Sequence, residues 1–192
     1  MKGLIRKKEL ILERERFFAN AIGSAVFEKP SISLWMILIP ILFMHFIYRM
    51  QKFKYGRLKF DEEFMATRLR AMALAVEAGE TGIKPNMDQM VREYGLQDAL
   101  EGPYAAWMRV LVEHYMDLLS ATGDSFESLV RSAYRNRINY LMTLNRLNTV
   151  EKEFYSVLKP KLDATEGAAE IITIIETQSQ QLRRKLAEQI FA

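Results

Sequence analysis

An uninterrupted apolar stretch from residue 32 to residue 48 constrains this chain more than any other feature of its sequence. Ser33 and His45 are the polar residues in it, so it lacks the polar stripe of a helix that lies on the surface of a globular domain. As a helix the stretch would cover roughly 25 Å, which is within the range of bilayer-spanning segments. The stretch therefore predicts a membrane segment, and a fully buried core helix is the alternative.

Aromatic and basic side chains flank the apolar stretch in the way that is typical of membrane anchors. Amphipathic rings prefer the headgroup level, and Lys and Arg are enriched on the cytoplasmic side. Three Lys or Arg precede the stretch within about 20 residues and six follow it, which predicts a cytoplasmic C-terminal domain. The residues expected to form the anchor are Trp35, Pro40, Tyr48, Arg49, Lys52, Lys54, Arg57 and Lys59.

Pro40 lies near the middle of this membrane segment, which we assign to residues 31–57. Because proline removes a helical hydrogen bond and kinks a helix, the segment can form one kinked span or a re-entrant hairpin with both flanks in the cytoplasm. We expect the kinked span, since spanning helices tolerate such prolines. The hairpin remains the alternative, because a single span would carry seven basic residues across the bilayer with the N-terminal tail.

Residues 1–30 have the pattern of a basic amphipathic helix. Leu4, Ile11, Phe18 and Ile22 fall near one side of it, and the segment contains seven Lys or Arg and four Glu. Such a helix suits the interface of a membrane with anionic headgroups. A helix docked on the protein's own domain or on a partner has the same pattern, so both placements stay open.

Residues 58–192 predict a helical bundle. Apolar residues recur there at helical spacing between Gly and Pro breaks, and no segment of strand length alternates with period two. Asn86 with Gln89, and Asp124 with Glu127, predict helix caps. The expected helices cover about 58–78, a short segment after Asn86, 103–122, 125–158 and 165 onward. The predicted fold is all-α, with an N-terminal amphipathic helix and a Pro-kinked membrane helix followed by a bundle of four or five helices.

The sequence carries no recognisable catalytic motif. It contains no Cys, which excludes thiol catalysis and disulfides, and no nucleotide-binding loop or H-E-x-x-H motif. His114 lies between Glu113 and Asp117, but the Glu-x-x-His spacing of a di-iron bundle is absent. We therefore expect no catalytic residue, no metal site and no bound cofactor. His45 is the one candidate for binding a cofactor, a haem or a quinone, although so close to Tyr48 it can simply reach the headgroups.

Charge is divided between a basic front and an acidic rear. Residues 1–30 and 49–59 together carry a net charge of +8, whereas residues 60–192 carry −5. A nucleic-acid binder would spread positive charge over its folded domain, so no nucleic-acid partner is expected. Candidate contacts to a partner protein are Arg131, Arg135 and Arg146, in an Arg- and Asn-rich helix whose alternative is a solvated face.

The anchor, the long amphipathic helices and the lack of catalytic motifs together predict a membrane-bound accessory or scaffold subunit that is not an enzyme. Its expected partners are a bilayer with anionic headgroups and other protein subunits, or further copies of the chain. One alternative is a redox membrane subunit that uses His45. Another is a sensor with a ligand pocket in the bundle, lined by Tyr104, Trp107 and Tyr115.

Overall fold

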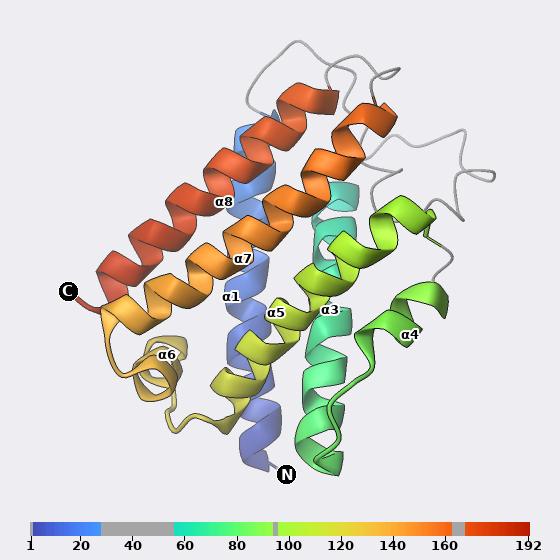
Figure 1. Ribbon diagram of the computed structural model, residues 1–192. Helices are drawn as coiled ribbons and strands as arrows, with labels where there is room; N and C mark the ends of the chain where they lie inside the picture. Colours follow the sequence, from blue (N-terminus) through green and yellow to red (C-terminus); the bar gives the residue numbers. More distant parts are fainter. Residues whose placement is uncertain (1, 28–55, 94–95, 163–167) are drawn as a thin grey trace.

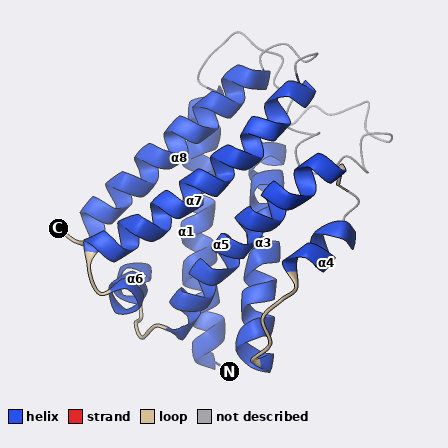
Figure 2. Cartoon of the chain, viewed as in Figure 1, coloured by secondary structure: helices blue, strands red, loops and turns tan. Residues whose placement is uncertain are grey.

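Five long α-helices form the body of the molecule in the computed structural model, which describes residues 2–27, 56–93, 96–162 and 168–192. They are α1 (Lys2–Phe27), α3 (Gly56–Thr81), α5 (Asp98–Ser120), α7 (Arg137–Leu158) and α8 (Ala168–Ile190). Two shorter helices, α4 (Met87–Glu93) and α6 (Phe126–Tyr134), and a 3₁₀ turn, η3 (Lys159–Leu162), are also present. The described ranges contain no strand (Figures 1 and 2), so the prediction of an all-α bundle is confirmed.

Helix α5 occupies the middle of the bundle, where it packs against α3, α4 and α7 (Figure 1). An aromatic cluster fills the contact between α5 and α7. The Trp107 ring lies 5.5 Å from that of Phe154 and meets Tyr104 edge to face at 6.0 Å, measured between ring centroids. All three side chains are buried, and aromatic pairs at such distances stabilise a core beyond the burial of their area.

The N-terminal helix α1 is part of the bundle. Its apolar stripe faces α3 and α8, and Ile11, Ala19 and Ile22 are completely buried there. Lys7 adds a polar contact by donating from Nζ to the carbonyl oxygen of Leu119 on α5 at 3.0 Å. Of the two placements that the sequence left open for the N-terminal helix, residues 2–27 have the docked one. Their apolar stripe faces the protein's own core, because α3 and α8 supply enough apolar surface to cover it.

Helices α1 and α3 lie side by side and run in opposite directions. Glu15 pairs with Arg68, while Phe18, further along α1, meets Phe64, which comes earlier in α3. The end of α1 and the beginning of α3 are therefore at the same end of the bundle, as Figure 1 also shows. The 28 residues that connect them are numbers 28–55 and lie outside the described part of the chain.

The predicted helix over 125–158 is wrong in one respect: it is two helices. Helix α6 ends at Tyr134, Arg135 has a positive φ of 64°, and α7 starts again at Arg137. The Asn136 side chain caps α7 by accepting a hydrogen bond from the backbone N–H of Asn139 at 2.9 Å. An Asn side chain that bonds nearby backbone groups competes with helix continuation, which explains a break that no Gly or Pro announces.

Two more helix starts differ from expectation. The predicted cap of Asp124 with Glu127 is wrong, because Ser125 and Ser128 bond each other's backbone N–H instead, at 3.2 and 3.0 Å. Helix α5 starts at Asp98 rather than at Pro103.

The Asn86 cap is confirmed. Its Oδ1 accepts a hydrogen bond from the Gln89 backbone N–H at 3.1 Å.

None of the helices in the described ranges is both long enough and apolar enough to cross a membrane. The predicted membrane segment covers residues 31–57, and residues 31–55 of it fall outside those ranges. Arg57 and Lys59 lie in the first turn of α3, where the structure describes the backbone only.

Candidate functional site

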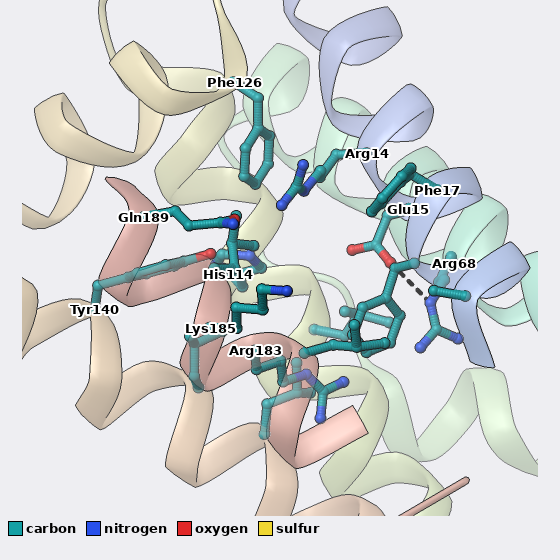
Figure 3. A pocket seen from close by; sticks show the side chains of 17 residues that line it. Arg14, Glu15, Phe17, Arg68, His114, Phe126, Tyr140, Arg183, Lys185 and Gln189 are labelled. Atoms are coloured by element: carbon teal, nitrogen blue, oxygen red, sulfur yellow. Dashed lines mark hydrogen bonds and ion pairs between the residues drawn. The ribbon is translucent and has the colours of Figure 1, made fainter. Parts of the chain in front are cut away.

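A cavity of about 220 Å³ lies among α1, α3, α5, α6, α7 and α8 (Figure 3). Its walls are mostly apolar and aromatic. They include Phe18, Leu111, Phe126, Leu144, Leu147 and Leu186, which come from five of the six helices. Cavities between the helices of a bundle are common places for small-molecule binding, so the polar groups that face this space decide what it can hold.

The mouth of the cavity lies between α1 and α8. The lining side chains that reach solvent all belong to these two helices: Phe17 is 61% exposed, Lys185 and Gln189 are exposed, and Arg14 is half buried. Figure 3 shows Arg14 and Lys185 extending from the two helices toward the same space. Arg14 also lies over two rings, with its guanidinium carbon 5.2 Å from the centroid of Phe17 and 5.7 Å from that of Phe126.

A network of buried ion pairs forms one side of the cavity. Arg68 donates from Nε to Glu15 Oε2 at 2.8 Å and from Nη1 to the carbonyl oxygen of Phe64 at 3.0 Å. Its Nη2 lies 3.8 Å from Oε1 of Glu151 on α7. The guanidinium of Arg68 also stacks on the Phe64 ring, 3.6 Å from its centroid. A side chain only 2% exposed thus has both a counter-charge and hydrogen bonds, as a buried cation requires.

Arg183 on α8 completes the network. It donates to both carboxylate oxygens of Glu151, at 2.8 Å from Nη2 to Oε1, and its Nη1 also donates to Oδ1 of Asn148. Burial disfavours the charged guanidinium most strongly, yet its pKa is raised, because the charge and hydrogen bonds of Glu151 and the charge of Glu15 together outweigh it. The ion network of Glu15, Arg68, Glu151 and Arg183 therefore joins α1, α3, α7 and α8 with two positive and two negative charges.

His114 lines the inner part of the cavity as a neutral ring. Burial, and to a lesser degree the positive charge of Arg183, lower its pKa from 6.5 to about 4. The Tyr134 hydroxyl is within hydrogen-bonding distance of Nδ1, and the Tyr134 ring stacks on the imidazole with centroids 5.8 Å apart. Tyr140 is the phenol that lines the cavity itself. Burial raises the pKa of both Tyr134 and Tyr140. Both phenols are therefore hydrogen-bond donors at neutral pH.

The pocket predicted from Tyr104, Trp107 and Tyr115 does not coincide with this cavity. Tyr104 and Trp107 pack into the aromatic cluster between α5 and α7, and none of the three side chains lines the cavity. The Tyr115 hydroxyl is completely buried and its pKa is raised, first by burial and then by the charge of Glu15. These three residues are buried in the core next to the cavity.

The three arginines proposed as partner contacts are dispersed. Arg131 donates from Nε to the carbonyl oxygen of Ile190 at 2.8 Å and so caps the end of α8. Arg146 pairs with Glu113 of α5 at 2.8 Å. Arg135, at the junction between α6 and α7, is exposed and lines a shallow hollow together with Met142. The first two thus make contacts within the chain.

The candidate cofactor ligand His45 lies outside the described residues, as do Trp35, Pro40, Tyr48, Arg49, Lys52 and Lys54. Across the described ranges, no three His, Asp or Glu side chains come together in a way that could hold a metal ion. The role of His45 as a cofactor ligand and that of the other six residues as a membrane anchor stay predictions.

The sequence analysis missed the buried ion network, although a signal for it was present. Arg68 stands between Phe64 and Met72 on one apolar stripe, and Glu151 stands between Leu147 and Phe154 on another. A charge at a position that the helical period assigns to the core must be paired if it is buried. Two such positions of opposite sign on different helices predict an ion pair.

Comparisons of the chain with models of protein families, with curated proteins and with solved structures give no match. The fold and the site therefore define the class of protein by themselves. It is an all-α bundle with a buried ion network and a cavity whose mouth is positively charged.

Proposed function

We propose that the protein is a membrane-anchored accessory subunit that is not an enzyme and whose helical bundle binds other protein subunits. In this proposal, residues 31–57 anchor the bundle to the cytoplasmic surface of a bilayer with anionic headgroups. The observation that carries it is the antiparallel packing of α1 and α3, which brings both flanks of the apolar stretch to one end of the bundle. A bundle with an apolar connection at one end is suited to attachment at a membrane surface.

This packing favours the re-entrant hairpin over the kinked span. A single span would put α1 and α3 on opposite sides of the bilayer, and the contact between Glu15 and Arg68 would then be impossible.

The surface proposed for partner binding lies at the start of α7. Ile138 and Met142 are one helical turn apart and are 70% and 65% exposed. Arg135 lines the same hollow as Met142 and contributes a positive charge. Apolar side chains exposed next to one another, with a charge beside them, are typical of protein interfaces. We call Arg135, Ile138 and Met142 the α7 surface.

Site-specific photo-crosslinking in native membranes tests this proposal. A photoreactive amino acid at position 142 should capture one discrete neighbour, and the same probe at Lys152, an exposed position further along α7, should not. Arg135→Glu should abolish the capture at position 142, because it reverses the charge of the α7 surface. Equal capture at both positions, or capture that survives Arg135→Glu, contradicts a specific partner at this surface.

A further inference from the structure

The cavity between α1 and α8 has a surplus of positive charge. Four cationic side chains line it, namely Arg14, Arg68, Arg183 and Lys185, and Glu15 is the carboxylate among the lining residues. Glu151 lies just behind the lining and pairs with Arg68 and Arg183. The two buried arginines are therefore matched by two carboxylates.

Arg14 and Lys185 account for the surplus. Within the described residues, neither has a carboxylate within ion-pairing distance, and both extend toward the cavity in Figure 3. Arg14 is held against the rings of Phe17 and Phe126. A guanidinium fixed in this way loses little freedom when it binds an anion, and its fork of donors matches a carboxylate. The mouth of the cavity is thus arranged for a negative head group.

The interior of the cavity is suited to an apolar group of modest size. Phe18, Leu111, Leu144 and Leu147 form its walls. An apolar cavity of about 150 Å³ holds a benzene molecule, so about 220 Å³ holds one aromatic ring with a short chain. The buried ion network presents no net charge to this space, and the His114 ring is neutral there at physiological pH. A second charge on the ligand, inside the cavity, would have no partner.

From these observations we infer that the cavity is a binding site for a small aromatic carboxylate, whose ring enters between Leu111 and Leu144 and whose carboxylate lies between Arg14 and Lys185. This inference stands independently of the membrane anchor and of the α7 surface. It gives the bundle a ligand-binding role at a place different from the pocket expected around Trp107.

Binding of 3-phenylpropionate to the purified full chain tests the inference, with the same buffer without protein as the blank. Isothermal titration calorimetry should detect saturable binding of the carboxylate. The neutral amide of the same acid should bind about tenfold more weakly or worse, because it lacks the charge-assisted hydrogen bonds. The cationic 3-phenylpropylamine should not bind. No saturable binding of the carboxylate, or equal binding of the carboxylate and the amide, would overturn the inference.

Two variants locate the binding site. The double substitution Arg14→Gln and Lys185→Gln should weaken binding of the carboxylate at least about tenfold, and Ala21→Phe should abolish it by filling the cavity. Arg184→Gln is the matched control, since it removes an exposed charge from the adjacent position of α8 outside the cavity lining. Circular dichroism checks that each variant is folded. A folded double variant with unchanged affinity would show that the carboxylate binds elsewhere.

Discussion

At the scale of single residues, the stability of this bundle depends on a few charges that are largely buried. Glu151 accepts hydrogen bonds from Arg183 through both carboxylate oxygens and also lies near Arg68. Such a pair adds little compared with well-packed apolar side chains, but removing one partner leaves the other buried and unpaired. Substitutions in the ion network should therefore have strongly non-additive effects.

Glu151→Gln should lower the free energy of unfolding by about 3–5 kcal/mol, because it leaves Arg183 without its counter-charge. Urea unfolding of the full chain, followed by circular dichroism, measures the change in the free energy of unfolding. Glu153→Gln, at an exposed position of the same helix, should change the free energy of unfolding by no more than about 0.5 kcal/mol. The double variant Glu151→Leu and Arg183→Met should be more stable than Glu151→Gln. Similar effects of Glu151→Gln and Glu153→Gln would contradict the buried network.

His114 should make the protein less stable in mild acid. Its pKa is about 4 in the folded protein, against 6.5 for an ordinary histidine. Between these values the unfolded chain binds a proton that the native chain does not, so stability falls as the pH drops from about 6.5 toward 4. At pH 4.5 this loss amounts to roughly 2–3 kcal/mol. Urea unfolding at pH 7 and pH 4.5 measures how much free energy of unfolding is lost between the two pH values. That loss should be smaller by roughly 2–3 kcal/mol in His114→Gln than in the unsubstituted protein. An equal loss in both proteins would contradict a buried neutral imidazole.

At the scale of helices, the segment between α5 and α7 depends on close backbone contacts. The turn before α6 approaches the first turn of that helix so closely that a Cβ atom on Gly123 would meet the Ser128 side chain and lie 2.9 Å from the Leu129 backbone nitrogen. Ser128 cannot move aside freely, because it takes part in the reciprocal cap with Ser125. Glycine at this position is therefore required by packing.

Gly123→Ala should destabilise the protein by about 1–3 kcal/mol, since the added methyl group has no room. Gly79→Ala, in α3, is the matched control. Apart from its chain neighbours and the helix's own backbone, no atom lies within 4 Å of the Cβ position at Gly79, so alanine should stabilise that helix by about 0.5–1 kcal/mol. The melting temperatures of the two variants, measured by thermal unfolding, should therefore shift in opposite directions. Shifts of the same sign would contradict the close approach at Gly123.

The break between α6 and α7 shows what sequence periodicity cannot resolve. Apolar spacing continues from Phe126 to Leu158 without a Gly or a Pro, so the sequence predicted one helix. The competing bonds of Asn136 are visible only once the backbone is known. Helical content and the approximate extent of α3, α4 and α8 could be predicted, because punctuation and period agree there. The cavity could not, because it depends on how six helices meet.

At the scale of the whole molecule, helices α1 and α3 flank the apolar connection, residues 28–55, in the sequence. Both helices pack in the same bundle and contact each other. In the proposed membrane-bound state, both flanks of residues 31–57 therefore lie on one side of the bilayer. That topology can be measured at exposed positions of α1 and α3.

Single cysteines test this topology cleanly, because the natural chain contains none. Asn20→Cys on α1 and Glu77→Cys on α3 are exposed positions. In sealed inside-out vesicles both should react with a membrane-impermeant maleimide, and in intact cells neither should. Ser156→Cys, at an exposed position of α7, reports on which side of the membrane the bundle lies. Labelling of positions 20 and 77 from opposite sides would contradict the hairpin, and full-length protein that stays in the supernatant after centrifugation without detergent would contradict the anchor.

The contact between α1 and α8 has a consequence for biosynthesis. Helix α1 leaves the ribosome before α8 and finds its apolar and charged partners partly on that later helix, with Glu15 and Arg183 acting in the same cluster. Until α8 has been synthesised, α1 has an uncovered face, and a nascent chain must keep that face away from other molecules. The bundle therefore closes only after α8 has left the ribosome, and a chain truncated before α8 should be a substrate for chaperones and proteases.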